Sequence, residues 1–330
     1  MIKIMVNLNS LKASTKTLSA SLKFHELVKN TKLRKIVDIL LIPVGFAKLK
    51  KREKNLRTLK YDNNRQLFIV AIVKGEEQYI DEWVQYHLMI GFDKIIIYDN
   101  SDNSKIYNSL KKFIKNNTVS YQKMSGAVRQ MDAYNDALNK VMKKDCYLMF
   151  LDADEFVFLK NKNINFKKKV NEVFNKNDYI GGLVINWEIF GSSHYKNKPN
   201  GLVTQNYIYR SKYNFIKNNH VKTICDPQKV AGVLNPHYPE YLEGYNAVNL
   251  ELKNVYGAFN KPNKKASVRI NHYFTKSKAE FMKKKSRGMA DSNLQRGIKD
   301  FEIHDRNEIY DDSMKRYKKE LERLLQNECK

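Results

Sequence analysis

The chain has 330 residues, of which 42% are hydrophobic and 12% aromatic. That much apolar material over that length can bury a core, which excludes disorder as the main state. Sixty lysines and arginines against 35 acids give a formal net charge of +25. The three cysteines, Cys146, Cys225 and Cys329, form no C-x-x-C pair. We therefore expect reduced thiols in a cytoplasm, with neither a disulfide framework nor a zinc site.

The positive charge is concentrated near the N-terminus. Residues 1–60 hold 15 lysines and arginines and three acids, a net charge of +12. Such asymmetry predicts an anionic partner, either nucleic acid or an anionic membrane surface. The sequence has no helix-turn-helix, zinc-finger or RNA-recognition pattern. We therefore expect only nonspecific affinity for nucleic acid.

One apolar segment, residues 36–47, lies within this basic region. It is shorter than the roughly 18–20 residues that span a bilayer, and Asp38, Pro43 and Gly45 interrupt it. Basic clusters flank it on both sides, which favours a helix lying in the interface of an anionic leaflet. The alternative is a helical extension, residues 1–65, that packs on the next domain. The run starts too late for a secretory signal.

From residue 66 the pattern alternates between short apolar runs and helical periodicity. This alternation predicts an α/β domain with an open, mostly parallel sheet and helices on both faces. The expected strands are residues 67–73, 94–98, 119–121 and 146–151. The expected helices between them are residues 76–90, 106–114 and 128–142. On the first of these helices, residues 76–90, Trp83, Tyr86 and His87 are expected to be core residues.

After residue 158 the alternation weakens. We expect a strand over residues 180–187, and long polar loops of the kind that often carry function. These loops are residues 191–193, 197–201 and 233–244. Helices with basic faces are predicted over residues 279–289 and 314–325. The domain boundaries that follow are a catalytic domain over residues 66–310 and a C-terminal helix over residues 311–330.

Polar side chains follow the predicted strands, where open sheets of this class bind their ligands. Most prominent are Asp152 and Asp154, spaced i, i+2 directly after a buried strand. Two such carboxylates can share one Mg²⁺ or Mn²⁺ ion. The ion would bridge the two phosphates of a nucleotide diphosphate and neutralise them as that group leaves. The alternative is a surface turn in which Asp154 caps the next segment.

Four separated motifs then point to a known family. They are K74-G-E-E-Q-Y-I-D-E-W-V-Q-Y-H87 with G91-F-D-K-I-I-I-Y-D-N-S101, L151-D-A-D-E-F156, W187-E-I-F-G-S-S193, and H272-Y-F-T-K-S-K-A-E-F281 with Lys284, Arg287 and Gly288. In this order, over residues 66–288, they resemble the family-92-like glycosyltransferases and the bacterial family 2 sugar transferases related to them.

The resemblance implies an A-type glycosyltransferase fold, which is Rossmann-like, with a nucleotide-sugar donor and a divalent metal. The positions matching the family's nucleotide-sugar site are Lys74, Glu76, Asp99, Arg129, Gln130, Asp152 and Lys222. The implied metal ligands are Asp152, Asp154 and His272, a mixed set suited to Mn²⁺ or Mg²⁺. Lys276 and Arg287 would offset the charge of the leaving diphosphate. The implied acceptor pocket comprises Trp187, Gly191, Ser192 and Ser193. For Lys222, a solvated strand position is an equal alternative.

The general base stays open. Inverting transfer needs a carboxylate that takes the proton from the acceptor hydroxyl. The candidates are Glu188, Asp226, Glu240 and Glu243. If none of them serves, a retaining mechanism remains.

We therefore expect a metal-dependent, inverting hexosyltransferase. Its donor would be a UDP-sugar, and its acceptor a hydroxyl of a cell-surface glycan such as lipopolysaccharide or capsule, built on a lipid. It would be cytoplasmic and peripheral on the inner face of the membrane. One alternative is a non-enzymatic basic protein that binds membrane or nucleic acid on a transferase-like shell. The other is a nucleotidyltransferase, which usually needs an early glycine-rich phosphate loop that this sequence lacks.

Overall fold

Residues 66–150 alternate strand and helix, as the apolar pattern predicts. The structure, a computed structural model, describes residues 7–22, 28, 30–56, 64–286 and 297–327. The alternating elements are β1 (Gln66–Val73), α5 (Ile80–Met89), β2 (Lys94–Asp99), α6 (Lys105–Lys115), β3 (Val119–Lys123), α7 (Gln130–Val141) and β4 (Cys146–Phe150).

Strand β1 is the centre of the parallel half of the sheet. It pairs in parallel with β2 on one side and β4 on the other, and β2 pairs in parallel with β3. Residues 67–73 are all buried because alternate side chains enter two cores, one on each face. Leu67 and Ile69 belong to the core that includes α5 and α6, whereas Phe68 and Val70 belong to the core that includes α7. The α/β class with helices on both faces is therefore confirmed.

The second half of the chain adds antiparallel strands to this sheet. Strand β8 (Val221–Cys225) lies antiparallel between β4 and β6 (Ile180–Ile189). Strand β13 (Val268–His272) pairs in parallel with β6 and antiparallel with β5 (Glu155–Leu159). The order of the main path is β12-β11-β6-β8-β4-β1-β2-β3. Strands β11 (Asn246–Val248) and β12 (Asn254–Val255) end it.

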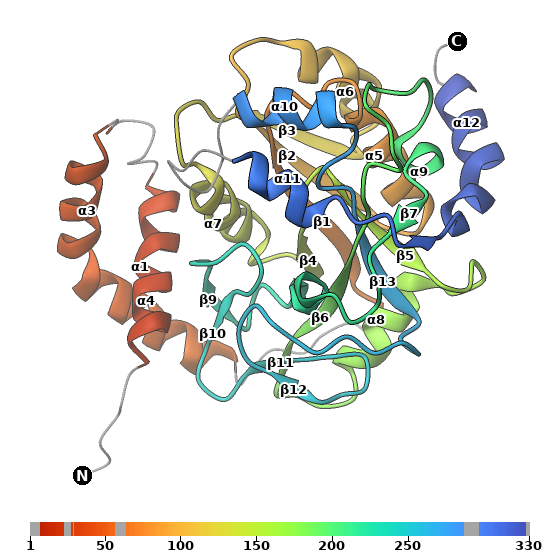
Figure 1. Cartoon of the computed structure of the whole chain (residues 1–330). Helices are drawn as coiled ribbons and strands as arrows, with labels where there is room; N and C mark the ends of the chain where they lie inside the picture. Colours follow the sequence, from red (N-terminus) through yellow and green to blue (C-terminus); the bar gives the residue numbers. More distant parts are fainter. Residues whose placement is uncertain (1–6, 23–27, 29, 57–63, 287–296, 328–330) are drawn as a thin grey trace.

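Short elements connect these strands and close the fold (Figure 1). The helices are α8 (Phe166–Phe174), α9 (Val203–Asn206), α10 (Lys278–Ser286), α11 (Ile298–His304) and α12 (Lys318–Asn327). Two 3-10 helices span Ile216–Asn219 and Ser313–Tyr317. Two small hairpins pair β9 (Val230–Gly232) with β10 (Glu240–Tyr241) and β7 (Tyr209–Arg210) with β14 (Ile309–Tyr310).

Several predicted boundaries need correction. The helix expected from residue 76 begins at Ile80, because Gly75 turns the chain with φ 63° after β1. The helix expected from residue 128 begins at Gln130, since Val128 has φ 53°. The polar loop 233–244 contains β10, and the helix expected over residues 314–325 is a 3-10 turn followed by α12.

Three N-terminal helices pack at one side of the sheet domain (Figure 1). They are α1 (Leu8–Ser21), α3 (Thr31–Leu40) and α4 (Ile42–Leu56). Helix α1 lies against α4, α7 and β9. Its Thr17 Oγ1 donates to Asn135 Oδ1 of α7 at 2.9 Å, and Asn139 Nδ2 donates to the Thr17 carbonyl at 2.6 Å. A Cβ on Gly232 of β9 would lie 2.3 Å from the Ala13 carbonyl oxygen, so only glycine fits there.

The interrupted apolar run 36–47 is therefore two helices, α3 and α4. Pro43 falls in the first turn of α4, where its missing N–H costs no helical hydrogen bond. Gly45 allows α4 to approach α1, because a Cβ there would lie 2.5 Å from Thr15 Oγ1. None of the described helices is long and apolar enough to cross a membrane.

Predictions for the core residues are confirmed. Trp83, Tyr86 and His87 are fully buried. Burial lowers the pKa of His87 to about 3, so its imidazole is neutral and purely structural. Cys146 and Cys225 are buried free thiols, and Cys329 lies outside the described residues.

A buried ion pair joins the start of β1 to the end of β8. Arg65 donates to both carboxylate oxygens of Asp226, at 2.8 and 3.1 Å, and both side chains are almost fully buried. Burial alone would lower the pKa of Arg65, but the hydrogen bond and charge of Asp226 outweigh it and raise that pKa. Asp226, one of the carboxylates considered as a general base, therefore holds the sheet together.

Replacing Asp226 by asparagine should destabilise the fold. The substitution removes the buried counter-charge of the Arg65 guanidinium and leaves only the half-exposed Asp145 at 2.7 Å, so we expect a loss of about 3 kcal/mol of unfolding free energy. Urea unfolding followed by circular dichroism measures this loss. The control is Glu322→Gln in the exposed pair with Lys318, for which we expect a loss below about 1 kcal/mol. Equal stability of the two variants would contradict the structural role.

Candidate active site

The two aspartates of the D-x-D motif lie in the turn between β4 and β5. The turn follows the carboxyl end of β4, next to the ends of β1 and β2 in the same parallel sheet. Asp154 is 8% exposed and Asp152 is partly buried. The carboxyl ends of parallel strands meet at one edge, so the motif lies at the position where sheets of this class bind ligands.

Both carboxylate oxygens of Asp152 accept hydrogen bonds from neighbouring side chains. Its Oδ1 accepts hydrogen bonds from Gln130 Nε2 at 2.9 Å and from Tyr134 OH at 3.2 Å. Its Oδ2 accepts one from Lys222 Nζ at 2.7 Å. Burial would raise the pKa of Asp152, but the adjacent Lys222 ammonium outweighs burial and lowers it. Asp152 is thus ionised, and both of its oxygens are already engaged.

Lys222 is a fully buried ammonium between two carboxylates. Its Nζ lies 2.7 Å from Asp152 Oδ2 and 3.6 Å from Glu155 Oε2. Glu155 is also fully buried, and its Oε2 accepts the Asp152 N–H at 2.9 Å. Burial raises the pKa of Glu155 well above its ordinary value, despite Lys222. Of the two alternatives for Lys222, a solvated strand position is therefore excluded. We call Asp152, Glu155 and Lys222 the buried triad.

Asp154 has different neighbours from Asp152. Its Oδ2 accepts a hydrogen bond from Lys284 of α10, and its Oδ1 lies 3.6 Å from His272 Nε2 at the end of β13. Burial would raise the pKa of Asp154, but Lys284 and then His272 hold it well below the ordinary value. Burial also lowers the pKa of His272, although Asp154 opposes this. The pair is thus a carboxylate beside an imidazole that burial favours in its neutral form.

Trp187 brings three histidines together beside this pair. Its ring centroid lies 4.2 Å from that of His272, 4.8 Å from that of His220 and 5.0 Å from that of His237. Burial lowers the pKa of His220, and burial together with Lys222 lowers the pKa of His237 to about 3. Sequence reasoning missed His220 and His237. The only signals were that His220 lies two residues before Lys222 and that His237 lies in a long polar loop.

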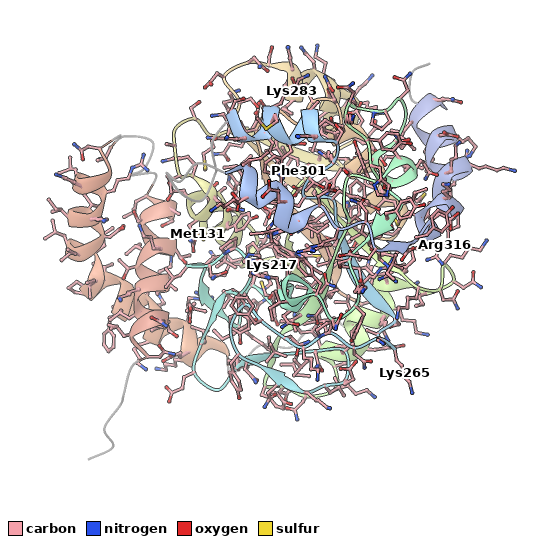
Figure 2. All side chains as sticks on the ribbon, viewed as in Figure 1. Met131, Lys217, Lys265, Lys283, Phe301 and Arg316 are labelled. Atoms are coloured by element: carbon pink, nitrogen blue, oxygen red, sulfur yellow. The ribbon has the colours of Figure 1, made fainter. Side chains whose placement is uncertain are left out.

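A basic cavity of about 540 Å³ adjoins Asp154 through α10. Lys276 and Lys284 line it together with Gly75, Tyr79, Lys198 and Lys283. Figure 2 labels Lys283 on α10, above Phe301 of α11. Lys276 Nζ pairs with Glu76 Oε2 at 3.1 Å and lies 3.7 Å from the Tyr79 ring centroid. The predicted residues Glu76 and Lys276 are therefore brought together, with their charges balancing each other.

The other residues predicted to bind the nucleotide lie at the ends of β1 and β2 and at the start of α7. Asp99 is fully buried at the end of β2, and its Oδ2 accepts hydrogen bonds from Tyr121 OH at 2.7 Å and Lys123 Nζ at 3.1 Å. Lys74 is exposed just beyond β1. Arg129 is buried, and its Nη1 lies 3.0 Å from Asp132 Oδ2. Gln130, in contrast, contacts the D-x-D motif directly.

The predicted acceptor residues beyond Trp187 form a tight turn. A Cβ on Gly191 would lie 2.4 Å from the Arg306 carbonyl oxygen. The Ser192 N–H donates to Asp305 Oδ1 at 2.6 Å. Ser193 Oγ accepts the N–H groups of residues 208 and 209. These contacts connect the turn to residues 305–307 and to β7. They give Gly191, Ser192 and Ser193 each a structural role in the turn.

The three remaining base candidates lie away from the D-x-D motif. Glu188 pairs with Arg210 at 2.9 Å and Arg269 at 3.8 Å, and it lines a cavity of about 690 Å³ that Trp187 also lines. Glu240 and Glu243 line a cavity of about 470 Å³ beside α1 and α4. Neither cavity is lined by Asp152, Asp154 or His272. The predicted residues Arg287 and Gly288 lie outside the described residues.

Comparison with known proteins identifies the class. Residues 70–322 match the model of glycosyltransferase family 92. This match covers most of the chain, which therefore belongs to glycosyltransferase family 92. The family assignment and the largely parallel sheet confirm the A-type fold that the sequence motifs implied.

Individual relatives are distant. A glycosyltransferase family 92 protein of Ricinus communis is 23% identical over 218 residues, which make up 65% of this chain and 36% of that protein. The match thus spans about a third of the relative's length. The crystal structure of S. aureus TarS is similar over 49% of this chain and 28% of its own, with 14% identity and a TM-score of 0.31.

The stability of the fold should depend on the charge of Lys222 in the buried triad. Lys222→Met removes the ammonium from between two carboxylates, which should lower the unfolding free energy by about 3–5 kcal/mol at pH 7. Burial already raises the folded-state pKa of Glu155, and without Lys222 that pKa should rise further, while the pKa of Asp152 should no longer be lowered. The folded variant then binds more protons than the folded wild type, so it should lose more stability than the wild type as the pH rises from 5 to 7.

Urea unfolding at pH 5 and pH 7 measures both effects. The control is Lys167→Met, which breaks a half-exposed pair with Asp93 and should cost no more than about 1 kcal/mol, with little change between the two pH values. A Lys222→Met variant as stable as the wild type at both pH values would show that the triad is not held together by this charge.

Proposed function

We propose that this glycosyltransferase transfers a sugar from a UDP-sugar to a hydroxyl of a cell-surface glycan such as lipopolysaccharide or capsule. Membership of family 92 supports the transfer of a sugar. The main support for a donor site is the pair of Asp154 and His272 at the carboxyl edge of the sheet. A basic cavity lined by Lys276 and Lys284 lies beside this pair. Cationic side chains around such a cavity suit the two phosphates of a nucleotide diphosphate.

We further propose that the reaction uses Mn²⁺ or Mg²⁺ held by Asp154 and His272. Among the described residues no three His, Cys, Asp or Glu side chains group closely enough to hold a metal ion. Two protein ligands still fit, because Mg²⁺ commonly takes one or two carboxylates and completes its shell with water and substrate phosphates. The neutral imidazole of His272 would add one nitrogen donor to a shell otherwise made of the oxygen ligands that Mn²⁺ and Mg²⁺ prefer.

Asp152 fits the role of metal ligand less well than Asp154. Its oxygens already accept hydrogen bonds from Gln130, Tyr134 and Lys222. We therefore assign Asp152 to holding the turn, and Asp154 to the metal. When bound, the metal would supply positive charge to the leaving diphosphate. Lys284, which lines the basic cavity, would then leave Asp154 and turn its ammonium toward the phosphates of the donor.

The proposal includes inversion at the anomeric carbon, which rests on the sequence resemblance. Glu188 engages two arginines, and Glu240 and Glu243 line a cavity next to α1. Their positions give none of them a contact with the D-x-D motif. Proton NMR of the first-formed product decides the stereochemistry directly, since the coupling constant at the anomeric proton separates inversion from retention.

Calorimetric binding of UDP, with and without Mn²⁺, tests the donor site. We expect Mn²⁺-dependent binding by the wild type. Asp154→Asn should weaken it at least tenfold, because loss of one charged ligand costs more than about 1.4 kcal/mol. The matched control is Asp312→Asn, an exposed aspartate in the loop before the 3-10 helix 313–317, which should bind as the wild type does.

Three other outcomes are informative. Equal binding with and without Mn²⁺ would contradict the metal assignment while leaving the donor site intact. Binding of CDP or GDP instead of UDP would correct the nucleotide. Failure to bind any of these nucleotides would favour a non-enzymatic role on a transferase-like shell. Incorporation of sugar into a glycan, rather than of a nucleotide, separates the proposal from a nucleotidyltransferase.

A further inference from the structure

The outer helices α3 and α4 expose an unusual number of large apolar side chains. Ile39 is 63% exposed and Leu40 72% exposed, at the end of α3. Seven such side chains occur within 14 residues; they are Leu33, Ile36, Ile39, Leu40, Ile42, Val44 and Phe46. A folded protein rarely leaves so many apolar side chains of one short segment in water unless a partner covers them. We call these seven residues the apolar patch.

The apolar patch lies in a basic stretch of the sequence. The described N-terminal helices carry ten lysines and arginines and two acids, Asp38 and Glu53. Both acids are paired with lysines, Asp38 with Lys16 and Glu53 with Lys50. Exposed lysines lie on both sides of the patch in sequence, at Lys32 before it and at Lys51 and Lys54 after it, and Lys35 is exposed between Leu33 and Ile36. The segment is therefore rich in exposed apolar side chains, with exposed lysines within it and on both sides of it in sequence.

The apolar patch is fixed to the catalytic domain. Helix α1 hydrogen-bonds to α7, as described above, and α3 is tied to α7 by an ion pair of Arg34 Nη1 with Asp132 Oδ2 at 3.5 Å. From α4, Arg52 Nη2 donates to the carbonyl oxygens of Pro227, at 3.2 Å, and Val230, at 2.5 Å. A surface anchored at several points holds a fixed orientation relative to the active site.

We propose that the apolar patch docks α3 and the start of α4 in the interface of an anionic phospholipid bilayer. This inference goes beyond sugar transfer and does not depend on it. Apolar side chains would enter the acyl boundary while the flanking lysines reach the phosphates, as in monotopic amphipathic helices. A nucleic acid would match the lysines but would leave the aliphatic side chains uncovered. A second copy of the chain would bring the same lysines together.

The proposal also orients the enzyme. Helix α7 lies between the N-terminal helices and the active site: Asp132 pairs with Arg34 of α3, and Gln130 contacts Asp152. Figure 1 shows α1 between α3 and α7. Docking would thus place the first turn of α7, and with it the site, near the inner face of the cytoplasmic membrane. An acceptor carried on a lipid would be presented there.

Vesicle binding by the full-length chain tests the apolar contribution. The wild type should float with vesicles of equal parts phosphatidylglycerol and phosphatidylcholine. The double variant Ile39→Ser, Leu40→Ser should bind at least about tenfold more weakly, since each residue loses several buried CH₂ groups. The matched control is Ile216→Ser, Tyr310→Ser, two residues 68% and 54% exposed and outside the N-terminal helices, which should bind as the wild type does.

A second pair of variants tests the charge. Lys32→Gln, Lys35→Gln should weaken binding by about tenfold or more at low salt, given about 1 kcal/mol for each basic residue near an anionic surface. Its control is Lys111→Gln, Lys115→Gln on α6, both exposed. Circular dichroism of all four variants checks that they fold. Binding of the wild type should also weaken on vesicles of phosphatidylcholine alone.

Three results would overturn the proposal. The first is wild-type protein that does not float with anionic vesicles. The second is equal loss of binding in the α3 variants and their controls, which would indicate general charge attraction. The third is a dimer of the wild type that Ile39→Ser, Leu40→Ser dissociates without altering vesicle binding, which would assign the apolar patch to a second copy of the chain. UDP binding by each variant shows whether the donor site is independently intact.

Discussion

A single buried ammonium, that of Lys222, holds the active-site turn in place. It lies between the carboxylates of Asp152 and Glu155, and all three come from different segments: the turn after β4, the start of β5, and the antiparallel strand β8. Removing a charge from water is costly, and only a close counter-charge offsets the cost. The insertion of β8 beside β4 is therefore what allows an acidic turn to exist at the carboxyl edge of this sheet.

The sequence predicted the first half of the fold because most of its strands are apolar runs that regularly alternate with helical periodicity. Strand β1 has eight residues and a continuous apolar run, and each helix shows its period before the next strand begins. The second half contains strands of two or three residues, such as β7, β10 and β12. Strands this short have no readable period. Strands β8 and β13 have five residues each, but their partners lie far along the chain, so their places in the sheet could not be predicted from the sequence.

The same limit applies to the active site. The D-x-D motif could be predicted from the sequence because it directly follows an apolar strand, and the structure places it at the expected edge of the sheet. Lys222, however, reaches Asp152 across 70 residues of sequence, and Lys284 reaches Asp154 across 130. Closeness in sequence to a motif residue, in turn, does not ensure closeness in space. Glu188 follows a motif residue directly, yet it pairs with Arg210 and Arg269, away from the D-x-D motif.

The two aspartates of one motif therefore differ in what they can do. Asp152 is bound by Gln130, Tyr134 and Lys222, so a ligand that needed its oxygens would have to break contacts that hold the turn. Among the described residues, the carboxylate of Asp154 contacts Lys284 of α10 and the imidazole of His272. A lysine side chain has a flexible stem and can rotate away at little cost. A cation bound at Asp154 would thus exchange one positive charge for another, leaving the buried triad undisturbed.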